Sequence, residues 1–329
     1  MIAEYRCAPT DRPATATHRP VFPARVYAPD LKIPFHDAFR KFLPNCHRNT
    51  GSLKAFFWRK AQTGVAKQES AMSAYESKHA DAAGRYSYNS EEDAVWGDLF
   101  TRQMAFLEGR MAPAFRDAVH RLGLTAAHVP QVADVDARLH DLTGAGVVGV
   151  PALIPPARFF ELLSERKFPV ATFLRRREDM DYIEEPDIFH EVFGHCPLLT
   201  DPDYAAFIER FGKTAAKLGK PYSWRMFRLF WFTVEFGMIR TPEGIRGFGA
   251  GIASSLSEAA HATSGKAEML PFDLMTVFRT SYRIDIVQPV YFVIESFAQL
   301  AASLDADIGA MIDEAKRLGD LPARFEKAA

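Results

Sequence analysis

The amino-acid sequence predicts a mainly α-helical fold, a single helical domain with a few short strands. Apolar residues recur at helical spacing in most segments after residue 85, and helix start and stop signals bound them. Segments rich in β-branched residues are few and short. With 48% hydrophobic residues among 329, the chain can bury one large core or two modest ones.

Residues 1–84 differ in character from the rest of the chain. They and Arg85 hold 14 Lys and Arg against 7 Asp and Glu, prolines cluster early, and no long apolar periodicity appears. We therefore expect residues 1–84 to form a poorly ordered or loosely docked extension and residues 85–329 to form the domain. A native start at Met72 is an alternative that would remove most of the extension.

Start signals define the helices of the first half of the domain. Asn89 or Ser90, followed by two glutamates, marks a helix start, and apolar residues then recur up to Met111. Pro155 and Pro156 open another helix, Arg158–Glu165. The other elements expected here are helices at Pro113–Leu122 and Val135–Leu142, and short strands within Gly144–Ile154 and Phe168–Phe173.

The second half contains more helix and one glycine-rich segment. Asp201 caps a helix over Pro202–Leu218 that Gly219 ends. The glycine-rich segment Gly247–Ser255 lacks the strand-to-helix pattern of a phosphate loop, so we expect a tight turn before a helix starting near Ser254. The remaining expectations are a small sheet pairing Met269–Phe272 with Tyr282–Val287, and closing helices at Ile294–Leu304 and Ile308–Leu318.

Two histidines stand in the segment PDIFHEVFGHCPLL, which begins at Pro186. We expect a helix that starts at Pro186, with Asp187 in the first turn, where an acid suits the positive end of a helix. His190 would lie in its interior. Gly194 is a natural helix stop and a proline follows soon after, so His195 is expected just past the last regular turn.

The five-residue spacing of these histidines matters for metal binding. On an ideal α-helix five residues turn a side chain by about 140°, whereas four turn it by only about 40°. The motif HExxxH thus differs from HExxH of zinc proteases, whose histidines share a face. A break at Gly194 would let the His195 imidazole swing back toward His190, so that both could hold one metal. Ordinary packing of two core histidines is the alternative.

A carboxylate elsewhere in the chain suits the same metal. The segment Ser223–Met238 is apolar on every side, which predicts a buried helix, and its single acid is Glu235. A buried carboxylate must be protonated, paired with a cation or bound to a metal. Pairing with Arg228 or Arg240 is one possibility. Two histidines and one carboxylate on a metal face would suit non-haem Fe(II) that activates O₂.

Charge and cysteine content narrow the possible partners. A net charge of −1 and a pI near 6.8 give no reason to expect nucleic acid or an anionic membrane. No apolar segment approaches the ~18 residues of a membrane span, and no signal peptide is evident, so we expect a cytoplasmic protein. Cys7, Cys46 and Cys196 are too scattered for a disulfide framework. Cys196 beside His195 leaves a mixed His/His/Cys zinc site open.

The run Arg175, Arg176 and Arg177 precedes an acid-rich turn that includes Asp187. Such a charge run is usually a solvated face. A structural ion pair between one of these arginines and the turn is equally open.

These motifs, in this order, resemble the aromatic amino acid hydroxylases. The resemblance rests on PDIFHEVFGHCPLL, on FWFTVEFG with its acid forty residues after His195, and on GFGAGIASS and IVQPVYFVIESF. It runs from about Tyr86 to Leu318 and is strongest with the bacterial phenylalanine-hydroxylating members. It implies a mostly helical catalytic domain that uses Fe(II), O₂ and a tetrahydropterin to hydroxylate an aromatic ring.

The resemblance also implies roles for individual residues. The iron ligands would be His190, His195 and Glu235. The pterin would stack on Phe159 and be reached by Glu191 through water. The amino acid carboxylate would be gripped by Arg175, which Asp187 braces. Pro186 and Trp231 would be walls of the aromatic pocket, and the Ser254 hydroxyl would hold a ligand histidine in place.

Three departures from the family pattern limit what the resemblance implies. Phe230 stands where relatives commonly have a tyrosine, so no phenolic hydroxyl is expected there. Ile183 and Glu184 replace a Thr-Pro pair of animal members, which leaves the contacts of the substrate amino group open. Only 41 residues follow Gln288 (329 − 288), without sustained heptads, so we expect a monomer.

The hypothesis is a pterin-dependent, non-haem Fe(II) phenylalanine hydroxylase of phenylalanine catabolism. A tyrosine or tryptophan hydroxylase of the same family is the first alternative, although Ile284 stands where tyrosine hydroxylases look polar and acidic. A zinc hydrolase with Glu191 as general base is a more remote alternative, because the histidine spacing disfavours it. A module that merely stores metal is the last.

Overall fold

The structure is a computed structural model that describes residues 75–151, 154–183 and 185–325. Most of the predicted extension, residues 1–74, therefore lies outside the described residues. Tyr75 and Lys78, which belong to the predicted extension, contact the domain. The ring of Tyr75 stacks on Phe173 at a centroid distance of 4.9 Å, and the Lys78 ammonium lies 2.9 Å from the Glu92 carboxylate.

The fold is mainly α-helical, as predicted, and most helices begin at a local cap. Asn89 and Glu92 form a reciprocal capping box at the start of α2, and the Asp201 side chain accepts two backbone N–H groups at the start of α6. The helices of the first half are α2 (Ser90–Phe106), α3 (Pro113–Leu122), α4 (Val132–Thr143) and α5 (Pro156–Ser164). Those of the second half are α6 (Pro202–Leu218), α7 (Lys220–Phe230), α8 (Ala250–Ser254), α9 (Leu256–Ala262), α10 (Leu274–Arg279), α11 (Phe297–Ala302) and α12 (Ile308–Leu318).

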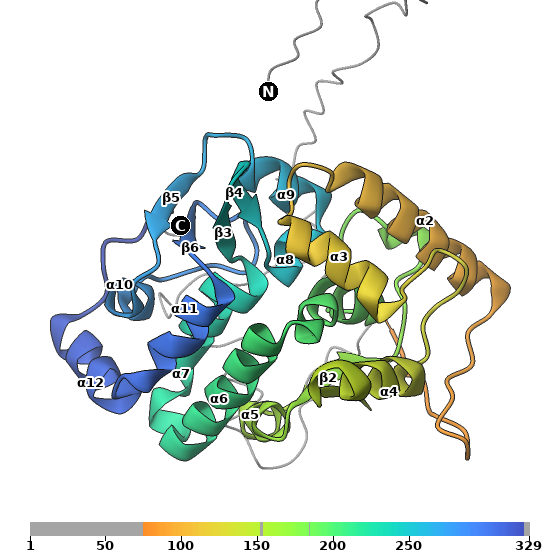
Figure 1. The fold of residues 1–329 in the computed structure, drawn as a ribbon, viewed down its shortest axis with the longest axis horizontal. Coiled ribbons are helices and arrows are strands. Elements are labelled where there is room, and N and C mark those ends of the chain that lie inside the picture. The colour runs from red at the N-terminus through yellow and green to blue at the C-terminus, as the bar shows by residue number, and fades with distance from the viewer. Residues whose placement is uncertain (1–74, 152–153, 184, 326–329) are drawn as a thin grey trace, which may run out of the picture. The chain divides into compact units, whose positions relative to one another are not determined.

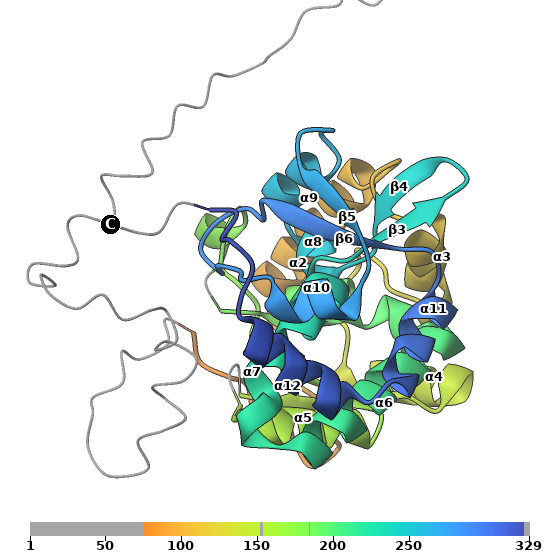
Figure 2. The same cartoon turned by 90° about the vertical axis from the view of Figure 1, so that its left-hand side faces the viewer.

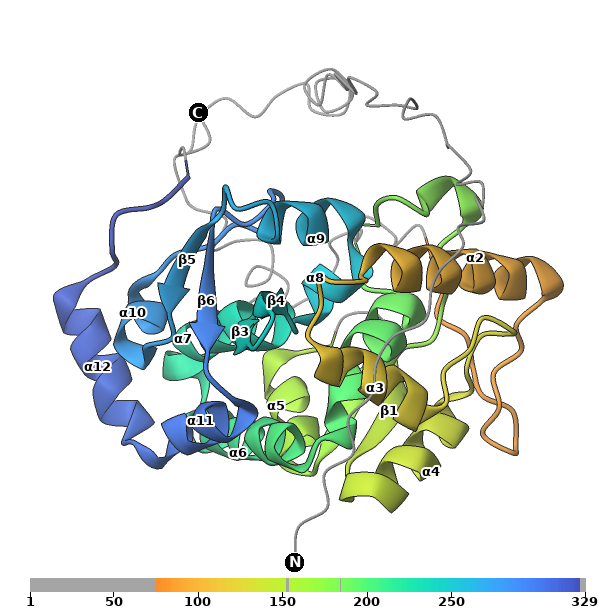
Figure 3. The same cartoon turned by 45° about the horizontal axis from the view of Figure 1, so that its top comes forward.

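Two small sheets complete the described fold. Strands β1 (Gly146–Val150) and β2 (Lys167–Ala171) pair in parallel around helix α5. The other sheet has the order β4-β3-β6-β5. Its strands are β3 (Met238–Thr241), β4 (Gly244–Gly247), β5 (Glu268–Pro271) and β6 (Val290–Ile294). Figures 1 and 3 show this sheet and the β1–β2–α4 region on opposite sides of the described domain.

The predicted pairing of the small sheet was wrong in its second strand. Strand β5 pairs with β6, whereas residues 282–287 form a loop. The loop carries the Arg283–Asp285 ion pair, while all five residues of β6 are buried. A strand covered on both faces must be apolar throughout, and Val290–Ile294 meets that condition.

The helix predicted over Ser223–Met238 was too long at its C-terminal end. Helix α7 continues as a π-helix over Trp231–Glu235, and Met238 begins strand β3. Strands β3 and β4 form an antiparallel hairpin that was not predicted. Pro242 and Glu243 between the strands, followed by Gly244 at the start of β4, are a turn signal that could have revealed the hairpin.

One continuous hydrophobic core joins these elements. Helix α10 contacts both α7 and α12, which ties the C-terminal helix to the helix that leads to Glu235 (Figure 2). None of the described helices has the length and apolarity that a bilayer span requires.

Candidate metal centre

The two histidines lie on a π-helix, Phe189–His195, that does not break at Gly194. The predicted start at Pro186 and stop at Gly194 were therefore wrong. The chain continues without interruption into a 3₁₀ turn, Pro197–Thr200. The wider turn of a π-helix is seen in the bond from the Cys196 N–H to the Glu191 carbonyl, five residues back, at 3.3 Å.

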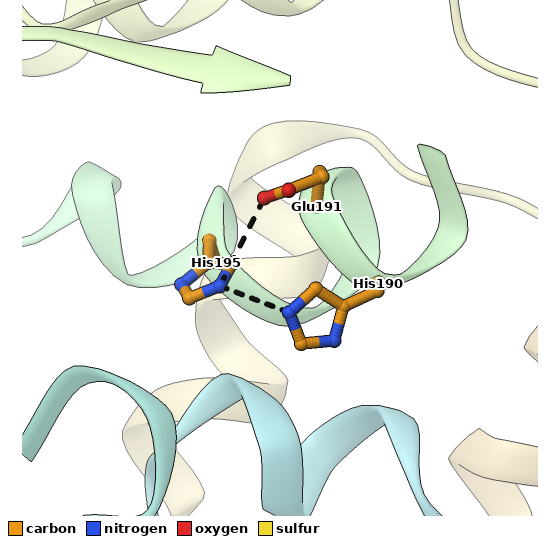
Figure 4. Close-up of side chains that lie close together, drawn as sticks. All are labelled: His190, Glu191 and His195. Carbon is orange, nitrogen blue, oxygen red and sulfur yellow. Dashed lines mark hydrogen bonds and ion pairs between the residues drawn. The ribbon is translucent and has the colours of Figure 1, made fainter. Parts of the chain in front are cut away.

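The π-helix solves the spacing problem that an α-helix would create. Because each turn takes up more residues, side chains five apart return to the same side of the helix. The Nε2 atoms of His190 and His195 accordingly lie 3.2 Å apart (Figure 4). The local winding of the helix, rather than a swung-back residue beyond its end, brings the two imidazoles together.

Glu235 approaches the same point from a second π-helix, Trp231–Glu235. Its carboxylate lies 3.2 Å from Nε2 of His195 and 3.6 Å from Nε2 of His190. The proposed alternative partners of Glu235 are engaged elsewhere: Arg228 pairs with Asp320 at 2.7 Å, and Arg240 with Glu295 at 3.1 Å.

These three side chains have the spacing of ligands on one ion. Two atoms bound at about 2.1 Å and at right angles on one metal lie about 3 Å apart. The two Nε2 atoms lie 3.2 Å apart, Oε1 of Glu235 lies 3.2 Å from Nε2 of His195, and Oε2 lies 3.6 Å from Nε2 of His190. The carboxylate thus faces both imidazoles at about the spacing expected of ligands around one ion. Nitrogen and carboxylate oxygen are donors that Fe(II) accepts.

Glu191 lies near the same point but farther away. Its carboxylate is 3.9 Å from Nε2 of His195, and possible ligand atoms of His190, Glu191 and His195 all lie within 4.8 Å of one another (Figure 4). Glu235 is closer to His195 and also approaches His190, so it is the better third donor. The mixed site with Cys196 was wrong, because that thiol donates to the Glu191 carbonyl instead.

Neighbouring groups orient the imidazoles. The Ser254 Oγ lies 2.8 Å from Nδ1 of His190 and itself donates to the Ala250 carbonyl at 2.9 Å. Since that hydroxyl proton is used, Nδ1–H of His190 donates to Oγ and Nε2 keeps its lone pair. The ring of His195 stacks on Phe168 at 4.5 Å.

Burial gives the charged groups of the centre different protonation preferences. It lowers the pKa of His190 to about 4, so this imidazole is neutral at pH 7, as a metal ligand must be. Burial, reinforced by Glu235 and Asp187, raises the pKa of Glu191 well above its usual range. Burial acts in the same direction on Glu235, but the nearby His195 and His190 outweigh it and lower the pKa of Glu235. Glu235 is thus the carboxylate that favours the ionised form.

The structure separates the three consecutive arginines. Arg175 is buried and donates from Nε and Nη2 to the two oxygens of Asp187, each at 2.8 Å. Burial opposes the charge of each partner, but their attraction prevails: the pKa of Arg175 is raised and that of Asp187 is lowered. Arg177 instead forms exposed pairs with Glu91 and Asp98. Asp187 also accepts the His190 backbone N–H, which links this pair to the histidine helix.

Aromatic rings surround the centre on the side of α5 and α7. Phe159 packs edge-on against Phe230 and Phe168 at 5.2 and 6.4 Å, and Phe168 in turn stacks on His195. Trp231 stacks on Tyr282 at 4.4 Å, and its indole N–H donates to the Gln288 side chain at 3.0 Å. Pro186 is half-buried at the start of the histidine segment.

Several residues of this region were not singled out by sequence reasoning. Gly249 lies directly before α8, and Gly251 is the second residue of that helix. A Cβ on Gly249 would lie 2.2 Å from the Glu235 carbonyl oxygen. The only sign of these residues in the sequence was the spacing of the glycines in this segment. Glycine has no side chain, so it allows α8 to approach Glu235 closely. The predicted helix start near Ser254 corresponds to α9, which begins at Leu256 with Ser255 as its cap, whereas the short helix α8 over Ala250–Ser254 was not predicted.

Comparisons with known proteins agree with this geometry. The family model described as biopterin-dependent aromatic amino acid hydroxylase matches residues 57–312, a segment that begins before Tyr86. A phenylalanine-4-hydroxylase from Pseudomonas aeruginosa is 43% identical over 245 residues, covering 74% of this chain and 94% of that protein.

Solved structures show the same likeness. The phenylalanine hydroxylase of Legionella pneumophila matches with a TM-score of 0.74 and 44% identity, covering 76% of this chain and all of that one. A Chromobacterium violaceum phenylalanine hydroxylase solved with bound Fe(III) matches with a TM-score of 0.70 and 40% identity, covering 73% and 88% of the two chains.

Proposed function

The chain belongs to the biopterin-dependent aromatic amino acid hydroxylases, and from this premise we infer that it is a phenylalanine 4-monooxygenase. The reaction is the conversion of L-phenylalanine to L-tyrosine with O₂ and a tetrahydropterin as cosubstrates. The hydrolase and metal-storage alternatives are set aside by membership of this family.

The observation that carries the proposal is the convergence of His190, His195 and Glu235. We propose these as the ligands of a ferrous ion, with two imidazoles and one carboxylate on a single face. When bound, such an ion supplies the activation of O₂ together with the pterin. Ser254 would keep the His190 imidazole in the tautomer that presents Nε2 to the metal.

The Arg175–Asp187 pair is suited to hold the substrate carboxylate. Asp187 uses Nε and one N–H of Nη2, so the guanidinium keeps Nη1 and the second N–H of Nη2 for another carboxylate. We propose that the amino acid binds there, with its ring against Pro186 and Trp231. Trp231 is half-buried, stacks on the ring of Tyr282 and donates its indole N–H to the side chain of Gln288.

The pterin would bind at Phe159, whose ring lies one aromatic neighbour away from His195. A flat heterocycle can stack on such a ring. Glu191, 3.9 Å from His195 Nε2, would reach the pterin through water. The surrounding rings of Phe168, Phe230 and Trp231 would limit the access of bulk water to the reaction.

The direct test is oxygen consumption by the purified protein with phenylalanine, a reduced pterin and ferrous iron. Tyrosine formed should match pterin oxidised in near-stoichiometric amounts, and omission of iron should abolish both. Parallel assays with tyrosine and tryptophan decide between members of the family. A higher kcat/KM for either of them than for phenylalanine would refute the assignment.

We further propose a monomer that works in the cytoplasm in phenylalanine catabolism. Light scattering after gel filtration should give a mass close to the 36.9 kDa of the chain. A stable dimer or tetramer would contradict this part of the proposal.

A further inference from the structure

A buried glutamine behind the aromatic pocket uses its whole side chain. Gln288 is 1% exposed, and its Oε1 accepts the indole N–H of Trp231 at 3.0 Å. Its Nε2 donates to the carbonyls of Arg283 and Ile286, each at 2.9 Å. Because an indole only donates and a carbonyl only accepts, these partners define the orientation of the amide without ambiguity.

Gln288 thereby joins two parts of the pocket wall. Trp231 lies four residues before Glu235 on the same π-helix, and its ring stacks on Tyr282 at 4.4 Å and an interplanar angle of 16°. Tyr282 begins the loop of residues 282–287 whose carbonyls Gln288 binds. The stack on Trp231 places Tyr282, and with it the start of this loop, beside the π-helix that carries Glu235.

Glu258 holds Gln288 in turn. Its Oε1 accepts the backbone N–H of Gln288 at 3.1 Å and the hydroxyl of Tyr291 at 2.6 Å. Glu258 is 5% exposed and lies on α9, which follows directly after the helix that carries Ser254. Figures 2 and 3 show α9 beside the sheet that contains β6. Burial of a carboxylate that contacts only two neutral donors costs folding free energy. This cost argues that the position of Gln288, which Glu258 supports, is important for the pocket.

We propose that Gln288, which Glu258 holds in place, is a positioning residue. It fixes the Trp231 indole and the 282–287 loop relative to each other, so that they form one rigid wall of the pocket. In this way it determines which aromatic side chain the pocket accepts. The inference rests on the proposed function, because it assumes that Trp231 faces the substrate ring. With the support intact, the wall is fitted to a single six-membered ring. Without it, Trp231 and Tyr282 can separate and admit a larger bicyclic ring.

The experiment compares Gln288→Met, which has nearly the same shape without hydrogen bonds, with the wild type. We expect KM for phenylalanine to rise about tenfold with a smaller change in kcat, and the preference for phenylalanine over tryptophan to fall about tenfold. Gln131→Met is the matched control. Gln131 also makes two bonds through its amide, to the N–H and carbonyl of Tyr86 at 2.8 and 3.0 Å, far along the chain from the pocket. That control should leave both quantities unchanged.

Two further variants separate positioning from simple stability. Glu258→Ala should reproduce the Gln288→Met kinetics, whereas Glu258→Gln keeps a carbonyl acceptor for both donors and should restore the wild-type KM. In a double-mutant cycle with Trp231→Phe, which lacks the indole N–H, the effect of Gln288→Met on the phenylalanine-to-tryptophan preference should largely disappear. If Gln288→Met fails to fold, Glu258→Ala replaces it in the double-mutant cycle. The same two comparisons then still test the positioning role.

Hydrogen exchange without substrate provides a readout independent of turnover. Amides of residues 282–287 should exchange faster in Gln288→Met and in Glu258→Ala than in the wild type. A wild type that hydroxylates no phenylalanine would overturn the proposed function while leaving this exchange test of the support intact. Unchanged selectivity together with additive effects in the cycle would overturn the positioning role.

Discussion

At the scale of single residues, the centre combines two carboxylates whose environments differ. Glu235 and Glu191 both lie near His195, yet only Glu235 has a lowered pKa. Their isosteric amide variants therefore distinguish the metal ligand from its neighbour. We expect Glu235→Gln to weaken Fe(II) binding by about 100-fold or more and Glu191→Gln by less than about tenfold. Titration of each purified variant with ferrous iron measures this, and the reverse order would reassign the ligand.

The buried Arg175 is expected to serve both binding and folding. Arg175→Ala leaves the Asp187 carboxylate buried without its partner, so the unfolding free energy should fall by about 3–5 kcal/mol. Arg175→Lys keeps the charge but loses the planar fork, and should raise KM for phenylalanine with a smaller loss of stability. Urea unfolding and steady-state kinetics measure the two effects.

Arg177→Ala is the matched control for these variants. It removes an exposed arginine from the same run, and should change neither KM nor the urea midpoint measurably. An unchanged KM in Arg175→Lys would show that the substrate carboxylate binds elsewhere.

Glu258 makes stability depend on pH in a defined direction. Burial raises its pKa from 4.5 to about 7, so its protonated form is favoured in the folded protein. The resulting stabilisation is complete below the unfolded value and is lost as pH rises through about 7. Glu258→Gln cannot ionise, so its stability relative to wild type should increase by about 3 kcal/mol between pH 4.5 and about pH 8. Urea unfolding at both pH values tests this, and a constant difference would contradict it.

At the scale of secondary structure, the metal centre depends on two π-helical segments held against α8. Gly194 of the histidine helix and Gly249 before α8 both face neighbouring backbone. A Cβ would lie 3.1 Å from the Ala250 carbonyl oxygen at the first position and 2.2 Å from the Glu235 carbonyl oxygen at the second. The absence of side chains at these glycines allows the approach that puts Ser254 against His190 and Glu235 near both imidazoles.

Gly249→Ala tests this role of close packing. Gly249 has φ −67°, which alanine adopts freely, so any effect is steric rather than conformational. We expect a loss of about 2–3 kcal/mol in the unfolding free energy and weaker Fe(II) binding, because the added carbon pushes α8 away from Glu235.

The matched control is Gly309→Ala in α12. There a Cβ meets the end of the Leu218 side chain at 3.1 Å, which can move. Gly309→Ala should be neutral or stabilising, since alanine favours a helix. Equal effects of the two substitutions would argue against a special role for Gly249.

At the scale of the whole molecule, the C-terminal segment is fastened to the helix that leads to the metal centre. Asp320 pairs with Arg228 and Arg225 of α7, each at 2.7 Å, and Arg279 of α10 donates to the Gly319 carbonyl at 2.8 Å. Arg228 is 2% exposed, so it depends on Asp320 for a charged partner. Asp320 thus stabilises the end of α7 that leads into the Trp231–Glu235 segment, although it lies more than ninety positions away in the sequence.

Removal of this contact should weaken the whole fold. We expect Asp320→Ala to lower the unfolding free energy by about 1–3 kcal/mol, less than for a fully buried pair because Asp320 is 43% exposed. Glu314→Ala, which breaks an exposed pair with Arg317 within α12, is the control and should have no measurable effect. Equal urea midpoints for Asp320→Ala and wild type would contradict the role assigned to the C-terminal segment.

Much of this protein was determined by its sequence alone. Helix bounds such as Pro113–Leu122, Pro202–Leu218 and Ile308–Leu318 followed from caps, prolines and periodicity, which act within one or two turns. The pairing of His190 and His195 with Glu235 also followed from local chemistry, because a buried carboxylate needs a cation and two imidazoles need a metal.

Only the tertiary structure decided how those residues meet. The sequence indicated a helix break at Gly194, whereas contacts with α8 accompany a continuous π-helix that aligns the histidines. The choice of Arg175 from three arginines, the partner of β5 and the support of Trp231 by Gln288 likewise depend on segments brought together by folding. Hydrogen bonds and close contacts between residues far apart in the sequence produce no periodic pattern along it. They form only because packing of the core brings those residues close together in space.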